Sequence, residues 1–153
     1  MRFEENDAKK RIIIVIISVL VLIAVLCGVL ALQNPERRIS RFVTENQADL
    51  EQLAAECLEG GTVPDSYQDV RVDGVFSGDE RIVQFFYNGF GLAPASKYYG
   101  FYYAESGEPA AYQNTDYPLT ETEDGWSWSA GGTDNGGLTR RITGNWFYYE
   151  AWF

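Results

Sequence analysis

An uncharged apolar run, Ile12–Leu32, constrains this 153-residue chain more than any other feature. A helix rises about 1.5 Å per residue, so a run of this length spans roughly 30 Å, the thickness of the hydrocarbon core of a bilayer. In lipid, every backbone polar group must be bonded within the segment. The run is therefore predicted to form a single transmembrane helix, although a signal peptide cut after Ala31 or a lipoprotein cut before Cys27 is an alternative.

The basic residues that flank this run predict its orientation. Four of them precede it, namely Arg2, Lys9, Lys10 and Arg11, and three follow it, namely Arg37, Arg38 and Arg41. Positive charge is retained on the cytoplasmic side, so residues 1–11 are predicted to form a short cytoplasmic tail and residues 33–153 a domain outside the cell. The three arginines after the run are expected to lie at the membrane surface, among lipid headgroups.

Residues 33–153 are enough for one domain with one hydrophobic core. The chain has a formal net charge of −10, and the acidic excess lies beyond residue 32. Such a domain repels polyanions, so nucleic-acid binding is not expected. The chain contains no histidine and only one cysteine beyond the apolar run, Cys57, so no metal, cofactor or internal disulfide is expected in the domain.

One amphipathic helix is predicted over residues 35–59. Asn34 and Pro35 suit the start of a helix, and Gly60 suits its end. Between them, apolar residues recur at steps of three and four, with a single polar break at Asn46. Cys57 belongs to this apolar stripe, so we expect a buried thiol rather than a reactive one.

After Pro64, short β-prone runs alternate with turn residues. The predicted strands are Asp69–Phe76, Arg81–Tyr87, Tyr98–Ala104, Ala110–Gln113, Gly125–Ala130, Leu138–Thr143 and Asn145–Trp152. The connection Asn88–Ser96 is expected to be a turn, and acidic Leu119–Asp124 a mobile loop. Connections this short favour hairpins, so the strands predict an antiparallel meander. The expected fold class is α+β, with one helix packed on a curved sheet, which in outline resembles cystatin-like and NTF2-like domains.

Aromatic residues are the most unusual feature of the domain. The chain has ten Tyr, nine Phe and four Trp, and all but Phe3 lie beyond the apolar run. Alternation places aromatic rings on both faces of Tyr98–Tyr103 and of Asn145–Trp152. One helix covers only one sheet face, so either the sheet curls shut over the second face or an aromatic surface stays open. A candidate ligand-binding platform comprises Trp126, Trp128, Trp146, Tyr148, Glu150 and Trp152.

These features favour a non-enzymatic, membrane-anchored binding module whose partners are the lipid bilayer and an envelope protein or glycan. No catalytic residue is assigned, because no serine or cysteine has a histidine to activate it. A carbohydrate-active enzyme that uses Glu150 or Asp134 as its acid is the alternative, and it requires two carboxylates that face one cleft. A third hypothesis is an immunity or regulatory protein that masks a partner.

Overall fold

A computed structural model of the protein describes residues 16–23, 34–78, 80–92 and 95–153. The chain divides into two units, Met1–Asn34 and Pro35–Phe153, and each is described by itself. In the first unit, residues 16–23 are helical and their side chains are exposed. The other residues of the predicted transmembrane span Ile12–Leu32 lie outside the described residues. In the described part of the chain, no helix has both the length and the apolar character needed to cross a membrane.

Two helices, α2 (Pro35–Glu45) and α3 (Gln47–Leu58), begin the second unit. The prediction of one helix is wrong, because the chain breaks at Asn46. The Asn46 amide donates to the Phe42 carbonyl oxygen at 2.8 Å and accepts from the Gln68 amide at 3.0 Å. A side chain that bonds in this way competes with the regular helical pattern. Helix α3 ends as predicted, since Gly60 adopts a φ of 86° that glycine allows without steric cost.

Eight antiparallel strands form one open sheet, so the α+β class and the antiparallel pairing are confirmed. The strands are β1 (Ser66–Tyr67), β2 (Val70–Ser77), β3 (Arg81–Leu92), β4 (Ala95–Ala104), β5 (Thr120–Thr122), β6 (Gly125–Ser129), β7 (Gly136–Thr143) and β8 (Trp146–Trp152). Their order is β1-β2-β3-β4-β8-β7-β6-β5, so the single meander is wrong. Two four-stranded meanders meet where β8 pairs with β4. The last strand of the chain therefore lies at the centre of the sheet, where both of its aromatic faces are covered.

Three predicted segments differ from the structure. Residues 110–113 form no strand, because the Ala110 and Gln113 N–H groups donate to the side chains of Tyr102 and Gln84 rather than to a neighbouring strand. A short 3-10 turn, η1 (Tyr112–Asn114), takes that place. The expected loop at residues 119–124 contains β5, and the expected turn at 88–96 is largely the extended ends of β3 and β4.

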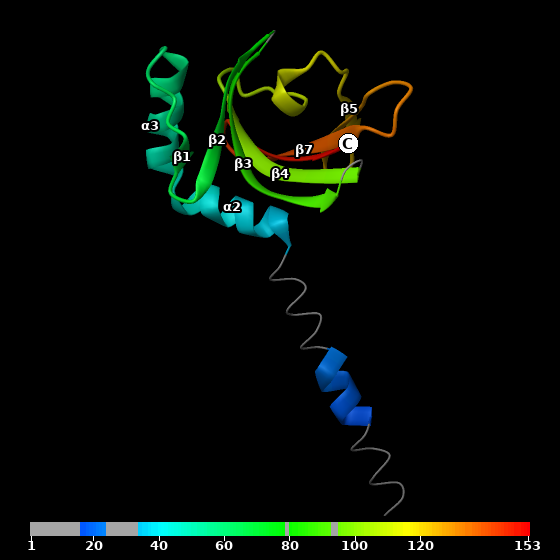
Figure 1. Cartoon of the computed structure of the whole chain (residues 1–153). Coiled ribbons are helices and arrows are strands. Elements are labelled where there is room, and N and C mark those ends of the chain that lie inside the picture. The colour runs from blue at the N-terminus through cyan, green and yellow to red at the C-terminus, as the bar shows by residue number, and fades with distance from the viewer. Residues whose placement is uncertain (1–15, 24–33, 79, 93–94) are drawn as a thin grey trace, which may run out of the picture. The chain divides into compact units, whose positions relative to one another are not determined.

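Helices α2 and α3 lie on one side of the sheet and the connection that contains η1 lies on the other (Figure 1), and each face carries a hydrophobic core. Helices α2 and α3 pack on one face, which we call the helix side, over Phe85, Phe101 and Trp146. The connection between β4 and β5, which includes η1, covers the opposite face over Tyr102 and Tyr149. The predicted alternation of aromatic side chains between the two faces of β4 and β8 is confirmed. The sheet thus stays open, and a connection rather than closure of the sheet covers its second face.

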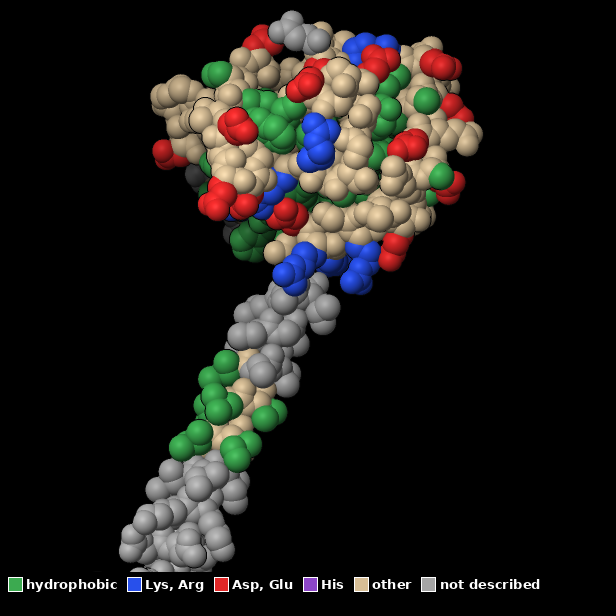
Figure 2. Space-filling view, turned by 180° about the vertical axis from the view of Figure 1, so that it is seen from behind, with side chains coloured by type: hydrophobic (Ala, Val, Ile, Leu, Met, Phe, Trp, Pro, Cys, Tyr) green, Lys and Arg blue, Asp and Glu red, His purple; other side chains and the backbone are tan. Residues whose placement is uncertain are grey.

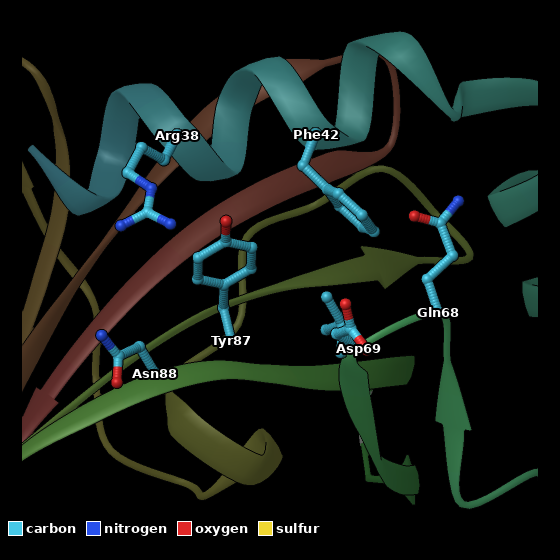
Figure 3. Close-up of a pocket in the computed structure, with 7 residues that line it drawn as sticks. Arg38, Phe42, Gln68, Asp69, Tyr87 and Asn88 are labelled. Atoms are coloured by element: carbon cyan, nitrogen blue, oxygen red, sulfur yellow. The ribbon is translucent and has the colours of Figure 1, made fainter. Parts of the chain in front are cut away.

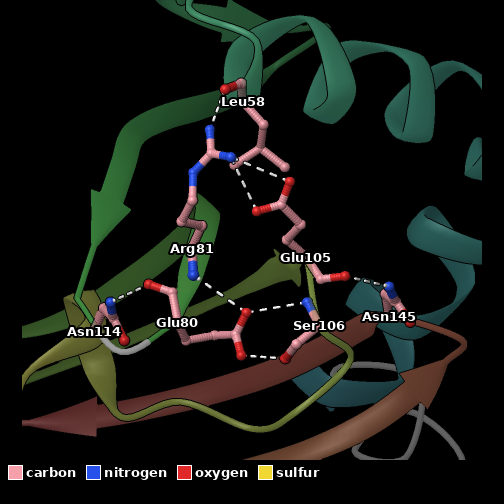
Figure 4. Close-up of polar contacts among 7 residues, drawn as sticks. All are labelled: Leu58, Glu80, Arg81, Glu105, Ser106, Asn114 and Asn145. Carbon is pink, nitrogen blue, oxygen red and sulfur yellow. Dashed lines mark hydrogen bonds and ion pairs between the residues drawn. The ribbon is translucent and has the colours of Figure 1, made fainter.

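A polar network joins several turns at the end of the sheet where β3 begins (Figure 4). The Arg81 guanidinium donates to the Leu58 carbonyl at the end of α3 and, at 3.0 Å, to Glu105. The Glu80 carboxylate accepts from the Arg81 and Ser106 backbone N–H groups at 3.2 and 3.0 Å. These groups hold one another in place, so the network fixes this end of the fold. The opposite end of β3 and β4 has no comparable network among the described residues.

Candidate functional site

The six residues of the predicted platform do not form one surface. Trp146, Tyr148, Glu150 and Trp152 alternate with the residues of β8 that face η1, and so point to the helix side. Trp128 packs instead in the core of the opposite face, and half-buried Trp126 packs against that core. Three of the six are core residues, since Trp146 is 0%, Tyr148 2% and Trp128 5% exposed.

A groove of about 290 Å³ remains open beside the predicted residue Trp152, and we call it the Trp152 groove. It is lined by Thr122, Glu123, Asp124, Trp126, Ser127, Leu138, Arg140 and Trp152. The sheet places Gly136 directly opposite Trp152, and a Cβ atom added at Gly136 would lie 3.0 Å from the indole. The missing side chain therefore lets the indole lie close against β7. Trp126 and Trp152 are the two platform residues that the structure brings to one groove.

A charged pair, Lys97 and Glu150, lies beside Trp152 but is not among the residues that line the groove. The Lys97 ammonium lies 2.7 Å from Glu150 Oε1 and 5.6 Å from the centre of the Trp152 ring. The hydrogen bond to Glu150 raises the pKa of Lys97. The Tyr148 hydroxyl donates to Glu150 Oε2 at 3.4 Å, and burial together with the charge of Glu150 raises the pKa of Tyr148 far above its ordinary value. Each oxygen of Glu150 therefore accepts a hydrogen bond from a group that stays protonated near neutral pH.

Arg140, which lines the groove, lies near two further carboxylates. Arg140 lies 2.6 Å from Glu36 at the start of α2 and 3.9 Å from Asp124. Asp134, the second predicted acid, lies in the exposed turn between β6 and β7 and is not among the residues that line the groove. Within residues 16–23, 34–78, 80–92 and 95–153, no group of histidine, cysteine and carboxylate side chains is arranged to hold a metal ion.

The three predicted membrane-surface arginines are all exposed on α2. The Arg38 guanidinium lies 5.8 Å from the centre of the Tyr87 ring. In the space-filling view, basic side chains gather along the lower rim of the domain, where α2 begins, whereas acidic side chains are spread over the rest of the visible face (Figure 2). The domain therefore presents a basic edge despite its acidic composition.

A second hollow, of about 400 Å³, lies beside α2, and we call it the α2 hollow (Figure 3). It is lined by Arg38, Phe42, Gln68, Asp69, Val70, Tyr87 and Asn88. Sequence reasoning did not assign a ligand-binding role to any of these residues. The one local signal was the polar break at Asn46, because the Asn46 amide bonds Gln68 at the edge of this hollow.

Comparisons with models of protein families, with curated proteins and with solved structures find no significant match to this chain.

Proposed function

We propose that this protein is a single-pass, membrane-anchored binding module whose folded domain, residues 33–153, lies outside the cell. The uncharged run at residues 12–32 and its basic flanks support the anchor and its direction. The three exposed arginines of α2, which follow that run in the sequence, suit contact with anionic headgroups. Residues 35–153 form a compact unit with its own cores, as expected of a domain carried on a tether.

The Trp152 groove is the observation that supports a binding role. Its half-buried indole supplies an apolar surface, and the exposed Lys97 ammonium beside it supplies a hydrogen-bond donor. A sugar ring presents an apolar face and hydroxyl groups at its edge, so it matches both features of the groove. We therefore propose an envelope glycan as the ligand, with an envelope protein as the alternative occupant.

The same contacts favour binding over glycoside cleavage. A glycosidase needs one carboxyl group to protonate the leaving oxygen and a second carboxylate across the cleft. Here Glu150 is bonded by Lys97 and Tyr148, and Arg140 lies beside both Glu36 and Asp124. These contacts engage oxygens of Glu150 and Glu36 and place a cation near Asp124, so these three carboxylates are less available to a substrate.

Retention on insoluble cell-wall glycan tests the proposed role of the groove. Full-length protein in phosphatidylcholine nanodiscs should sediment with the glycan, and W152A should reduce the bound fraction at least tenfold because the stacking surface is lost. Y117A is the matched control, since Tyr117 is also an exposed aromatic, 40% accessible, but stacks on Trp128 in the other core. Equal retention of W152A and wild type would exclude the groove as the contact.

Alkaline extraction of membranes tests the anchor separately. The full-length chain should stay in the membrane pellet, whereas a variant that begins at residue 33 should be released. Release of the intact full-length chain would contradict the proposed transmembrane helix.

A further inference from the structure

The α2 hollow has a cationic end and an anionic end that do not neutralise each other. Figure 3 places Arg38 with Asn88 at one end and Asp69 with Gln68 at the other. Within the described part of the chain, neither Arg38 nor Asp69 makes a side-chain hydrogen bond or an ion pair, and the contact of Arg38 is the face of Tyr87. Each end therefore keeps hydrogen-bonding capacity for a ligand of opposite charge.

Two aromatic rings separate these ends. Phe42 and Tyr87 meet edge to face, with ring centres 6.0 Å apart, and both line the hollow. Val70 adds a buried apolar side chain to the wall. The Tyr87 hydroxyl has no hydrogen-bond partner among the described residues. The middle of the hollow thus suits an apolar group, with a polar atom at its edge.

The wall of the hollow is shaped by the tight turn between β1 and β2. Gln68 has a φ of 51°, in the left-handed region that residues other than glycine seldom adopt. Its amide donates to Asn46 Oδ1 at 3.0 Å, and the Tyr67 hydroxyl donates to the same oxygen at 3.4 Å. Gln68 and Asp69 form the two-residue turn between the paired residues Tyr67 and Val70, and turns of this length use such a φ. The interruption between α2 and α3 therefore also shapes the hollow.

We propose that the α2 hollow binds a short peptide with both ends free. The peptide carboxylate bonds the Arg38 guanidinium, the peptide ammonium bonds the Asp69 carboxylate, and the apolar side chain between them contacts Phe42 and Tyr87. Guanidinium groups match the geometry of a carboxylate with two parallel hydrogen bonds. A volume of about 400 Å³ lies within the range of small-ligand sites, about 300–1,000 Å³. This site is separate from the Trp152 groove and does not depend on glycan binding.

Equilibrium dialysis with labelled Ala-Phe-Ala tests this proposal. The full-length protein is held in nanodiscs of neutral phosphatidylcholine, so that anionic headgroups do not compete for Arg38. Three peptides are compared: both ends free, the amino end acetylated, and the carboxyl end amidated. Wild-type protein should bind the free peptide at least fivefold more tightly than either blocked form.

Single substitutions test which residue binds each end of the peptide. R38Q should remove the preference for a free carboxylate and leave the preference for a free ammonium, and D69N should do the reverse. R41Q and D65N are matched controls, because Arg41 and Asp65 are exposed nearby but do not line the hollow. The proposal is overturned if the free peptide does not bind at millimolar concentration, if blocking either end leaves the affinity unchanged, or if the control variants lose as much affinity as R38Q and D69N.

Discussion

Tyr102 links the connection that contains η1 to the centre of the sheet. The Ala110 backbone N–H donates to the Tyr102 hydroxyl at 2.9 Å, and that hydroxyl lies 2.8 Å from Thr139 Oγ1. The Thr139 hydroxyl in turn donates to the Tyr148 carbonyl oxygen at 2.9 Å. All of these groups are buried, so each depends on the others for its hydrogen bond. One hydroxyl group thus connects β4, β7, β8 and the connection above them.

Removal of that hydroxyl should destabilise the domain. We expect Y102F to lower the free energy of unfolding by about 1–3 kcal/mol, because the Ala110 N–H loses its partner in a buried site. Y149F is the control: the Tyr149 hydroxyl is buried without a partner in the described structure, and the neighbouring Gln84 amide bonds Asp73 and Gln113 instead. Its removal should leave stability unchanged or higher. Urea unfolding of residues 33–153 measures both variants, and an equal loss in the two would refute this account.

At the scale of elements, glycine lets an aromatic ring cross a strand in the middle of the sheet. Gly100 of β4 lies opposite both Phe86 and Tyr149. A Cβ atom at this position would overlap the Phe85 carbonyl oxygen and would lie 2.6 Å from the Tyr149 ring. Gly137 of β7 leaves similar space for the Trp128 indole, whose Nε1 atom would lie 2.4 Å from an added Cβ atom. The aromatic side chains of one strand thus fill the space that glycine leaves on its neighbour.

A methyl group at Gly100 should therefore be poorly tolerated. We expect G100A to lower the free energy of unfolding by about 1–3 kcal/mol or more, since the backbone and the Tyr149 ring must both move. Gly131, in the turn after β6, has no atom within 4 Å of an added Cβ, so G131A should change stability by less than about 0.5 kcal/mol. Thermal unfolding followed by near-ultraviolet circular dichroism compares the two, and a tolerated G100A would contradict the packing described here.

At the scale of the whole molecule, two cores share one sheet, and tyrosines contribute to both. Burial raises the pKa of Tyr102 to about 12. Burial also raises the pKa of Tyr148 and of Tyr149 well above the ordinary value. In the unfolded chain a tyrosine loses its proton near pH 10. Above that pH the folded state binds more protons than the unfolded state, so stability decreases as the pH increases.

The domain should accordingly be sensitive to alkali. The contribution of the buried tyrosines to the free energy of unfolding should be fully present below about pH 10. Between pH 10 and 12 the free energy of unfolding should decrease by up to roughly 1.4 kcal/mol per pH unit for each buried tyrosine. Urea unfolding at pH 8, 9, 10 and 11 measures this slope, and Y102F should show a shallower one. A free energy of unfolding that stays constant from pH 9 to 11 would show that these hydroxyl groups ionise freely in the folded state.

Part of the candidate site followed from the sequence alone. Alternation along β4 and β8 was enough to place Trp152 and Glu150 on one face, and the apolar stripe was enough to bury Cys57, which is 3% exposed. The helix ends near Pro35 and Gly60 and the antiparallel pairing were also predicted. All of these depend on neighbours in the sequence, because side-chain direction repeats every two residues in a strand and every three or four in a helix.

The remaining features depend on segments that are distant in the sequence, and only the tertiary structure decided them. The pairing of β4 with β8 places the last strand at the centre, which buries Trp146 and leaves Trp152 at a groove. The cover over the second face comes from a segment for which the sequence predicted a strand, and its backbone bonds instead to the side chains of Tyr102 and Gln84. The α2 hollow forms because Asn46 meets Gln68, 22 positions away, and no local periodicity encodes a contact between two such residues.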